Sequence, residues 1–111
     1  MVTFNVWWNR YDRKFDCLIG YLEYDSKWIF YYDEEGVTVA ESLGFTLFPE
    51  FPDIEHVYQS EKLFPTFDIR IRRNTGKITE EDKVDLLSKT EGILQTDNIR
   101  ITKEETKVRQ I

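Results

Sequence analysis

The chain has 111 residues, of which 41% are hydrophobic and 32% charged, a balance typical of one globular domain and not of a disordered chain. Its net charge of −6 argues against a nucleic-acid binder, because such proteins draw much of their affinity from basic side chains facing phosphates. Its apolar runs are shorter than the roughly 20 residues that span a bilayer, and its start has neither the basic stretch nor the cleavage site of a signal peptide.

The soft metal ligands are few. Cys17 is the only cysteine, so no internal disulfide can form, and we expect a cytoplasmic location. His56 is the only histidine, so a transition-metal site would need carboxylates, and no suitably spaced set is present. The run 33–35 is acidic but lacks the alternation of a calcium loop, which favours a solvated turn. We therefore expect no metal and no cofactor.

Aromatic residues are concentrated in one part of the chain. All 17 of them lie at or before Phe67. This distribution predicts a single domain, 1–111, in which an aromatic-rich β core spans 1–67. A helix and a strand over 68–102 then pack on that core, and 103–111 form a polar tail.

The first half of the chain predicts a run of strands. Residues 3–9, 17–24 and 27–32 mix alternation with β-branched and aromatic residues, and their short connections favour an antiparallel meander, with Gly20 at a bulge. The segment 37–43 is consistent with either a short helix or an irregular crossing. Residues 44–48 alternate again and stop at Pro49, which predicts a further strand before a proline-containing loop over 49–57.

The second half predicts shorter elements. Ser60 suits the cap of one helical turn over 61–64, which Pro65 would end. Residues 67–72 are consistent with a strand or an irregular extension, and 74–77 with a turn. Thr79 begins a helix with acidic residues in its first turn, Gly92 ends it, and 98–102 read as the last strand.

The predicted fold class is therefore α+β. We expect a small β-rich domain with an antiparallel meander or a partly closed barrel and one or two short helices.

No motif indicates catalysis. The chain lacks a phosphate-binding glycine loop and a nucleophile elbow. His56 is more consistent with a surface loop than with a general base, since no nucleophile is indicated beside it. Cys17 lies in an apolar stretch and is expected to be a buried small hydrophobe. We predict that the protein is not an enzyme.

Two sets of residues suggest contact with a partner. Adjacent residues on a strand point to opposite faces, so we expect one of Trp7 and Trp8, and one of Tyr31 and Tyr32, to face outward, where such side chains favour binding. The one basic cluster is either a clamp on an acidic partner or phosphate, or simply a solvated face. It consists of Arg70, Arg72, Arg73 and Lys77.

Three segments resemble the N-terminal subdomain of HipA-type serine/threonine kinases. They are WIFYY at 28–32, GFTLFP at 44–49 and SEKLFPTF at 60–67, in the order of that family's w-x-F-x-Y strand, L-S-L-x-L-P strand and S-x-x-L-F-P-F-F turn. The later segments LSKTEG and QTDN are similar to a stretch in bacterial proteins that carry this subdomain before a HIRAN domain. The kinase core of the family is absent from this chain.

The resemblance implies a function for a free-standing subdomain. It is similar to the small antitoxin subunit of tripartite Hip modules, which binds and inhibits a HipA-like kinase. The implied contact residues are Tyr58, Ser60, Leu63, Phe64, Pro65, Phe67 and Arg70. On this interpretation Phe67→Ala would weaken the complex and leave the fold intact. The chain departs from the family at 66 and at 68–72, where its sequence is DIRIR.

Other functions stay open. The HIRAN association suggests an accessory domain that works with nucleic-acid machinery, although we expect no direct nucleic-acid contact and no membrane contact. A homodimer is a further alternative, because an open sheet edge can pair with itself.

Overall fold

A computed structural model describes residues 1–9, 16–71, 78–92 and 98–104 of the chain. This part contains one five-stranded sheet and three helices, which confirms the predicted α+β class but adds a helix to the expected one or two. The elements in chain order are β1 (Val2–Asn9), β2 (Asp16–Tyr24), β3 (Trp28–Tyr32), α1 (Glu34–Ser42), β4 (Tyr58–Ser60), α2 (Pro65–Asp68), α3 (Glu80–Thr90) and β5 (Ile99–Lys103).

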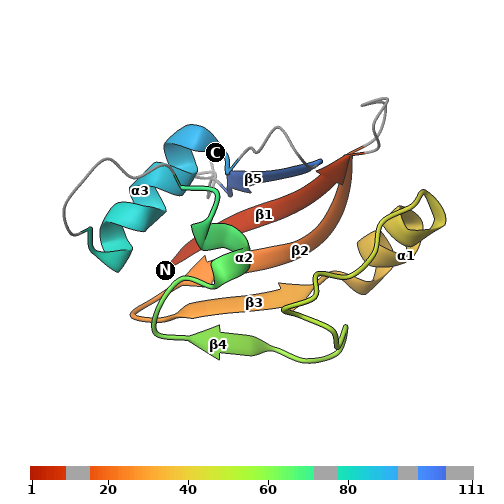
Figure 1. The fold of residues 1–111 in the computed structure, drawn as a ribbon, viewed down its shortest axis with the longest axis horizontal. Coiled ribbons are helices and arrows are strands. Elements are labelled where there is room, and N and C mark those ends of the chain that lie inside the picture. The colour runs from red at the N-terminus through yellow and green to blue at the C-terminus, as the bar shows by residue number, and fades with distance from the viewer. Residues whose placement is uncertain (10–15, 72–77, 93–97, 105–111) are drawn as a thin grey trace, which may run out of the picture.

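The sheet is an open antiparallel meander with the strand order β4-β3-β2-β1-β5 (Figure 1). The strands predicted at 3–9, 17–24, 27–32 and 98–102 are confirmed, with ends that differ by one residue. The alternative of a partly closed barrel is wrong, because β4 and β5 are the two edges of the sheet and do not pair with each other. The predicted turn at 74–77 and most of the predicted tail lie outside the described residues.

A bulge in β2 sets the register between the first two strands. Val6 lies opposite Gly20, whereas Trp7 lies opposite Leu18, so Ile19 is the additional residue on β2. The irregularity is therefore next to Gly20, where the sequence predicted it. A bulge of this kind bends the strand and increases its twist.

The helix α1 packs beside the first half of β2, beyond the end of the shorter strand β3 (Figure 1). Of the two alternatives for this segment, the helix is thus confirmed. Asp33 caps it, since the Asp33 carboxylate accepts a hydrogen bond of 2.8 Å from the amide of Gly36. Val37 and Ala40 are fully buried, and Gly36 lies so close to the carbonyl oxygen of Leu18 that no side chain fits between them.

The residues after α1 were predicted as a strand, and that prediction is wrong. Residues 44–48 have no regular structure. The amide of Phe45 donates instead to the carbonyl of Ala40 at the end of α1, and the amide of Phe48 donates to the hydroxyl of Tyr32. Because these donors already have partners, the segment has little need of a neighbouring strand.

The region around Pro65 also differs from the prediction. Ser60 belongs to strand β4, which the sequence analysis missed, and its hydroxyl accepts from the amide of Lys62. The helix predicted over 61–64 is wrong, because Pro65 begins α2 instead of ending a helix. Proline suits a first helical position, where its missing N–H has no partner in the helix anyway. Phe67 and Asp68 are in α2 and residues 69–71 have no regular structure, so the strand alternative for 67–72 is wrong and the irregular alternative holds only for 69–71.

The helix α3 begins and ends as predicted. Thr79 and Asp82 form a capping box, each side chain accepting from the other's backbone amide at 3.0 Å. At the other end Glu91 and Gly92 have left-handed backbone angles, which ends the helix. Val84 and Leu87 are its buried apolar residues.

We predict that Gly36→Ala destabilises the protein. Alanine favours a helix over glycine by about 1 kcal/mol, but the new methyl group would overlap the carbonyl oxygen of Leu18 and push α1 away from β2. Overpacking of this kind costs about 1–3 kcal/mol, so we expect a net loss in the free energy of unfolding, measured by urea denaturation. The matched control is Thr38→Ala at an exposed position of the same helix, where no loss is expected. An equally stable Gly36→Ala variant would show that α1 can move away from β2 at no cost.

Candidate functional site

The contact segment predicted from the sequence, residues 58–70, lies largely inside the protein. Of its seven candidate residues, only Pro65 is exposed. The others divide into Tyr58 and Ser60, which are partly exposed, and Leu63, Phe64, Phe67 and Arg70, which are buried. The structure therefore brings these residues together mainly as part of the core and leaves little of the segment for a partner to contact.

Phe64 and Phe67 belong to an aromatic cluster centred on Phe51. The ring centroid of Phe51 lies 4.4 Å from that of Phe30 and 5.1 Å from that of Phe64. The ring of Phe67 is 5.9 Å away and fully buried. Residues three apart lie on the same side of a helical turn, so the turn that begins at Pro65 directs both phenylalanines inward.

Arg70 has a structural role at the end of the contact segment. Its Nε donates to the carbonyl of Thr66 at 3.1 Å, and its Nη1 donates to the carbonyl of Gly92 at 3.2 Å. These bonds connect α2 to the C-terminal end of α3. The other members of the predicted basic cluster, Arg72, Arg73 and Lys77, lie outside the described residues.

The carboxylate of Glu80 connects α3 to β3 and to the contact segment. Its Oε1 accepts from the indole of Trp28 at 2.8 Å and from the amide of Leu63 at 2.9 Å. Its Oε2 lies 3.2 Å from the ammonium of Lys83, which is also 3.2 Å from the carboxylate of Asp68. Burial opposes ionisation of Glu80, but the hydrogen bonds from Leu63, Trp28 and Lys83 outweigh it, so the Glu80 pKa is lowered.

The two faces of the sheet differ in how they are covered. One face packs on the aromatic cluster, with α2 lying in front of the central strands (Figure 1). On the opposite face, none of the side chains that we assign from the strand pairing is fully buried; we call it the open face. It consists of Thr3, Asn5, Trp7, Leu18, Tyr21, Glu23, Ile29, Tyr31, Arg100 and Thr102.

Tyr21 and Tyr31 form an aromatic pair at the centre of the open face. They lie directly opposite each other on β2 and β3, with ring centroids 5.3 Å apart. The Tyr31 hydroxyl donates to Glu23 at 2.7 Å, and the Tyr21 hydroxyl donates to Asp33 at 3.3 Å. Burial and the bond to Glu23 raise the pKa of Tyr31 to about 12, and burial and Asp33 raise that of Tyr21. Both hydroxyls therefore stay protonated at neutral pH.

Negative charge surrounds this tyrosine pair. Besides Glu23 and Asp33, the charge of Glu104 contributes to the raised pKa of both tyrosines. Arg100 is the one cation among the ten residues of the open face, and its guanidinium is paired with Asp16 at 3.2 Å. The ten residues of the open face thus hold one acid and one base, and the nearby carboxylates of Asp33 and Glu104, outside this set, give the surroundings of the tyrosine pair an excess of negative charge.

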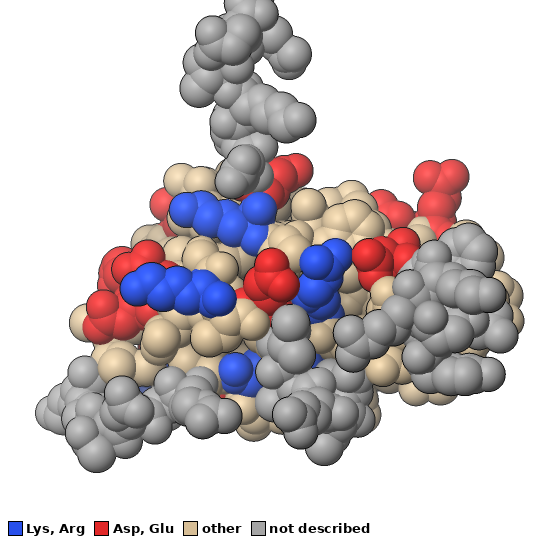
Figure 2. All heavy atoms as spheres, turned by 90° about the horizontal axis from the view of Figure 1, so that it is seen from above, with Lys and Arg blue, Asp and Glu red and all other residues tan. Residues whose placement is uncertain are grey.

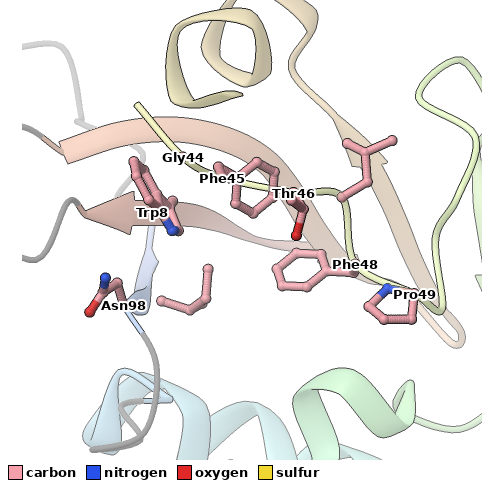
Figure 3. A pocket seen from close by; sticks show the side chains of 9 residues that line it. Trp8, Gly44, Phe45, Thr46, Phe48, Pro49 and Asn98 are labelled. Carbon is pink, nitrogen blue, oxygen red and sulfur yellow. The ribbon is translucent and has the colours of Figure 1, made fainter. Parts of the chain in front are cut away.

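A shallow pocket of about 270 Å³ lies where the segment after α1 meets the ends of β1 and β5. Figure 3 shows the rings of Trp8, Phe45 and Phe48 around it, with Thr46 and Asn98 at its rim. The centroids of Trp8 and Phe45 are 5.8 Å apart. No acid, base or cysteine is among the nine residues that line it, so its chemistry suits an apolar group and offers no acid–base pair.

The other candidates from the sequence lie apart from these sites. Cys17 is buried as expected, and burial followed by the neighbouring charge of Asp16 raises the pKa of its thiol. His56 lies in an exposed loop with its ring 4.5 Å from that of Tyr58. Among the described residues, no group of three or more His, Cys, Asp or Glu side chains could hold a metal ion.

The outward aromatic side chains were predicted only in part. Trp7 and Tyr31 lie on the open face, whereas Trp8 and Tyr32 lie on the covered one. Tyr21 and its acidic neighbours were not predicted from the sequence. Alternation alone could have placed Tyr21 and Glu23 on one face of β2, but which face was uncovered depended on distant packing.

The resemblance implied that Phe67→Ala would leave the fold intact, but Phe67 is fully buried, so we predict instead that this substitution lowers the stability of the fold. Replacing a fully buried phenylalanine by alanine costs about 3–5 kcal/mol through lost burial and the cavity left behind. The control is Ile69→Ala two residues away, whose side chain is 68% exposed and which should change the free energy of unfolding by less than about 0.5 kcal/mol. Similar urea midpoints for the two variants would contradict this placement of Phe67.

A second prediction concerns Glu80 and pH. Because its pKa is lower in the folded chain, its stabilising contribution is present above the ordinary value of 4.5 and is lost as the pH falls through the folded value. Glu80→Gln should cost about 1.5–3 kcal/mol at pH 7, the range for a hydrogen bond to a charged group.

The difference in free energy of unfolding between wild type and Glu80→Gln should then shrink as the pH falls below about 4.5. Glu81→Gln, at the neighbouring exposed position, is the control and should show a smaller effect. A difference that does not change with pH would mean that the charge of Glu80 does not stabilise the fold.

Comparisons with protein families, with curated proteins and with solved structures each found no match. Within the part of the chain that the structure describes, no helix has the length and apolar composition needed to cross a membrane.

Proposed function

We propose that this chain is a non-catalytic, cytoplasmic protein-binding regulator, and that its partner is a HipA-like serine/threonine kinase that it inhibits as an antitoxin. The observation that carries the binding part of the proposal is the accessible aromatic pair Tyr21 and Tyr31 on the open face. The kinase as partner rests on the resemblance of 28–32, 44–49 and 60–67.

The chemistry of the open face is that of recognition. Tyrosine and tryptophan contribute strongly to protein interfaces, because they bury a large ring and keep a polar group that can find a partner. Trp7, Tyr21 and Tyr31 each combine a partly exposed ring with a hydrogen-bonded polar group. Their donors are already oriented, so binding would cost less side-chain entropy than it would for free rotamers.

This surface replaces the contact that the resemblance implied. Phe64 and Phe67 are needed inside the core, so a partner that reached them would have to unfold part of the aromatic cluster. Of the implied contact residues, Pro65 is the exposed one. We therefore propose that the regulator binds through the open face while the turn at 60–67 supports the fold.

The alternative function, an accessory domain for nucleic-acid machinery, has one observation in its favour. Aromatic side chains on an exposed sheet can stack on the bases of a single strand. Such platforms normally include a basic groove for the phosphates. The carboxylates of Glu23, Asp33 and Glu104 lie near the tyrosine rings of the open face, and the side of the molecule seen from above, shown in Figure 2, mixes Lys and Arg with Asp and Glu instead of forming one basic stripe. Protein binding is therefore the better-supported function.

The alternative of a homodimer formed through a sheet edge meets an obstacle at β5. The amide of Ile101 does not face β1 in the ladder and donates instead to the carbonyl of Glu91 at 2.7 Å. The end of α3 thus covers part of the edge that a second copy would need.

We predict that the tagged chain, purified from its native cell, brings down a kinase-fold protein in near-equal amount. Mass spectrometry identifies the partner, and a phosphorylation assay with that kinase should show lower activity when the purified chain is added. Recovery of nucleases or helicases alone would favour the accessory function, and a captured kinase with unchanged activity would contradict inhibition.

Paired variants locate the contact in the same experiment. Replacing both Tyr21 and Tyr31 by leucine should reduce recovery of the kinase at least fivefold, whereas Pro65→Ala should not. The opposite result would show that the kinase contacts the turn at 60–67 and not the open face. Circular dichroism melts of both variants verify that each is folded.

A further inference from the structure

We propose that the open face binds a segment of the partner protein that carries arginine or lysine side chains. This inference rests on the proposed protein-binding function and adds the chemistry of the partner.

The tyrosine pair offers ring faces to a cation. Tyr21 and Tyr31 lie 5.3 Å apart and are tilted by 35°, and both are partly exposed. The faces of aromatic rings attract guanidinium and ammonium groups, by about 0.5–1 kcal/mol at an exposed site and more where water is excluded. Trp7 lies on the same face, and tryptophan is the residue type that forms the strongest cation–π contacts.

Carboxylates are placed where such a cation would lie. Glu23 and Asp33 each accept one tyrosine hydroxyl, at 2.7 and 3.3 Å. A carboxylate has about four acceptor positions, so one hydroxyl bond leaves it able to accept further donors from a guanidinium. Glu104 acts on both tyrosines from the end of β5, so negative charge approaches the pair from three separate elements of the chain.

Arg100, the one cation among the ten residues of the open face, does not neutralise this charge. Arg100 lies opposite Trp7 and is paired with Asp16. The tyrosine pair is therefore left with an excess of negative charge that a cationic partner would balance.

The same charges disfavour two other occupants. A single-stranded nucleic acid could stack on the rings, but its phosphates would face Glu23, Asp33 and Glu104. A second copy of this chain, related by two-fold symmetry, would bring the same acidic face against itself. A basic segment is the occupant for which rings and carboxylates act together.

The direct test uses a fluorescein-labelled peptide of four Gly-Arg repeats and the isotope-labelled full chain. We expect saturable binding by fluorescence anisotropy, and NMR shifts that centre on the Trp7 indole and the Tyr21 and Tyr31 amides. A matched Gly-Glu peptide should not bind. Shifts centred away from the open face, or tighter binding of an oligo-dT strand of equal length, would overturn the proposal.

Matched charge variants separate a specific site from the general attraction of an acidic protein. Glu23→Gln and Glu41→Gln remove the same charge, one on the open face and the other at an exposed position of α1. We expect about a fivefold loss of peptide affinity for the first, from one lost charge-assisted contact, and less than twofold for the second. Equal losses would mean unspecific attraction and would overturn the proposal.

Ring variants complete the design and distinguish this inference from the proposed function. Tyr31→Leu should reduce the affinity for the peptide more than Tyr31→Phe does, because only leucine removes the aromatic face. If capture of the kinase is reduced when both Tyr21 and Tyr31 are replaced by leucine but is unchanged in Glu23→Gln, and the Gly-Arg peptide does not bind, the inference of a basic partner segment fails and the proposed function stands. If the peptide binds as described but no kinase is captured, the inference of a basic partner segment stands and the assignment of a kinase as partner fails.

Discussion

The core depends on a segment, 43–57, that has no regular secondary structure and must still satisfy its backbone polar groups. The hydroxyl of Tyr32 satisfies two of these groups, because it donates to the carbonyl of Phe51 at 2.8 Å and accepts from the amide of Phe48 at 3.0 Å. Burial raises the pKa of this hydroxyl further above its ordinary value. One side chain at the end of β3 thus fixes the backbone of two phenylalanines whose rings pack on Phe30. The packing of Phe64 and Phe67 follows from that arrangement.

Local chemistry made much of the fold predictable. The first three strands follow from alternation, and α3 follows from the Thr79 cap and the Gly92 stop. The predictions are wrong where side chains distant in the sequence determine the local secondary structure. Residues 44–48 alternate like a strand, but Tyr32 takes up the amide of Phe48. Pro65 is compatible with the end of one helix or the start of another, and only the packing of Phe67 on the aromatic cluster selects the start.

The candidate site was less predictable than the fold, for a physical reason. The segments that carry the resemblance to HipA-type subdomains are rich in aromatic residues, and in this fold those aromatic residues mostly form the core: Trp28, Phe30, Phe64 and Phe67 are all buried. Such motifs describe how the chain packs, and they say little about which surface a partner contacts. The residues of the open face are distributed over β1, β2, β3 and β5 and become neighbours only through the strand register.

The acidic surroundings of the tyrosine pair also bear on the choice between partner classes. Stacking of a base on an aromatic ring contributes about 1–3 kcal/mol, which alone would make the open face a reasonable platform for a single strand. Phosphates of that strand would however approach Glu23, Asp33 or Glu104, and Arg100, the one cation among the ten residues of the open face, is already paired with Asp16. A guanidinium gains from the ring and from the carboxylate at once. The same aromatic face is thus directed towards a protein partner by the charges placed beside it.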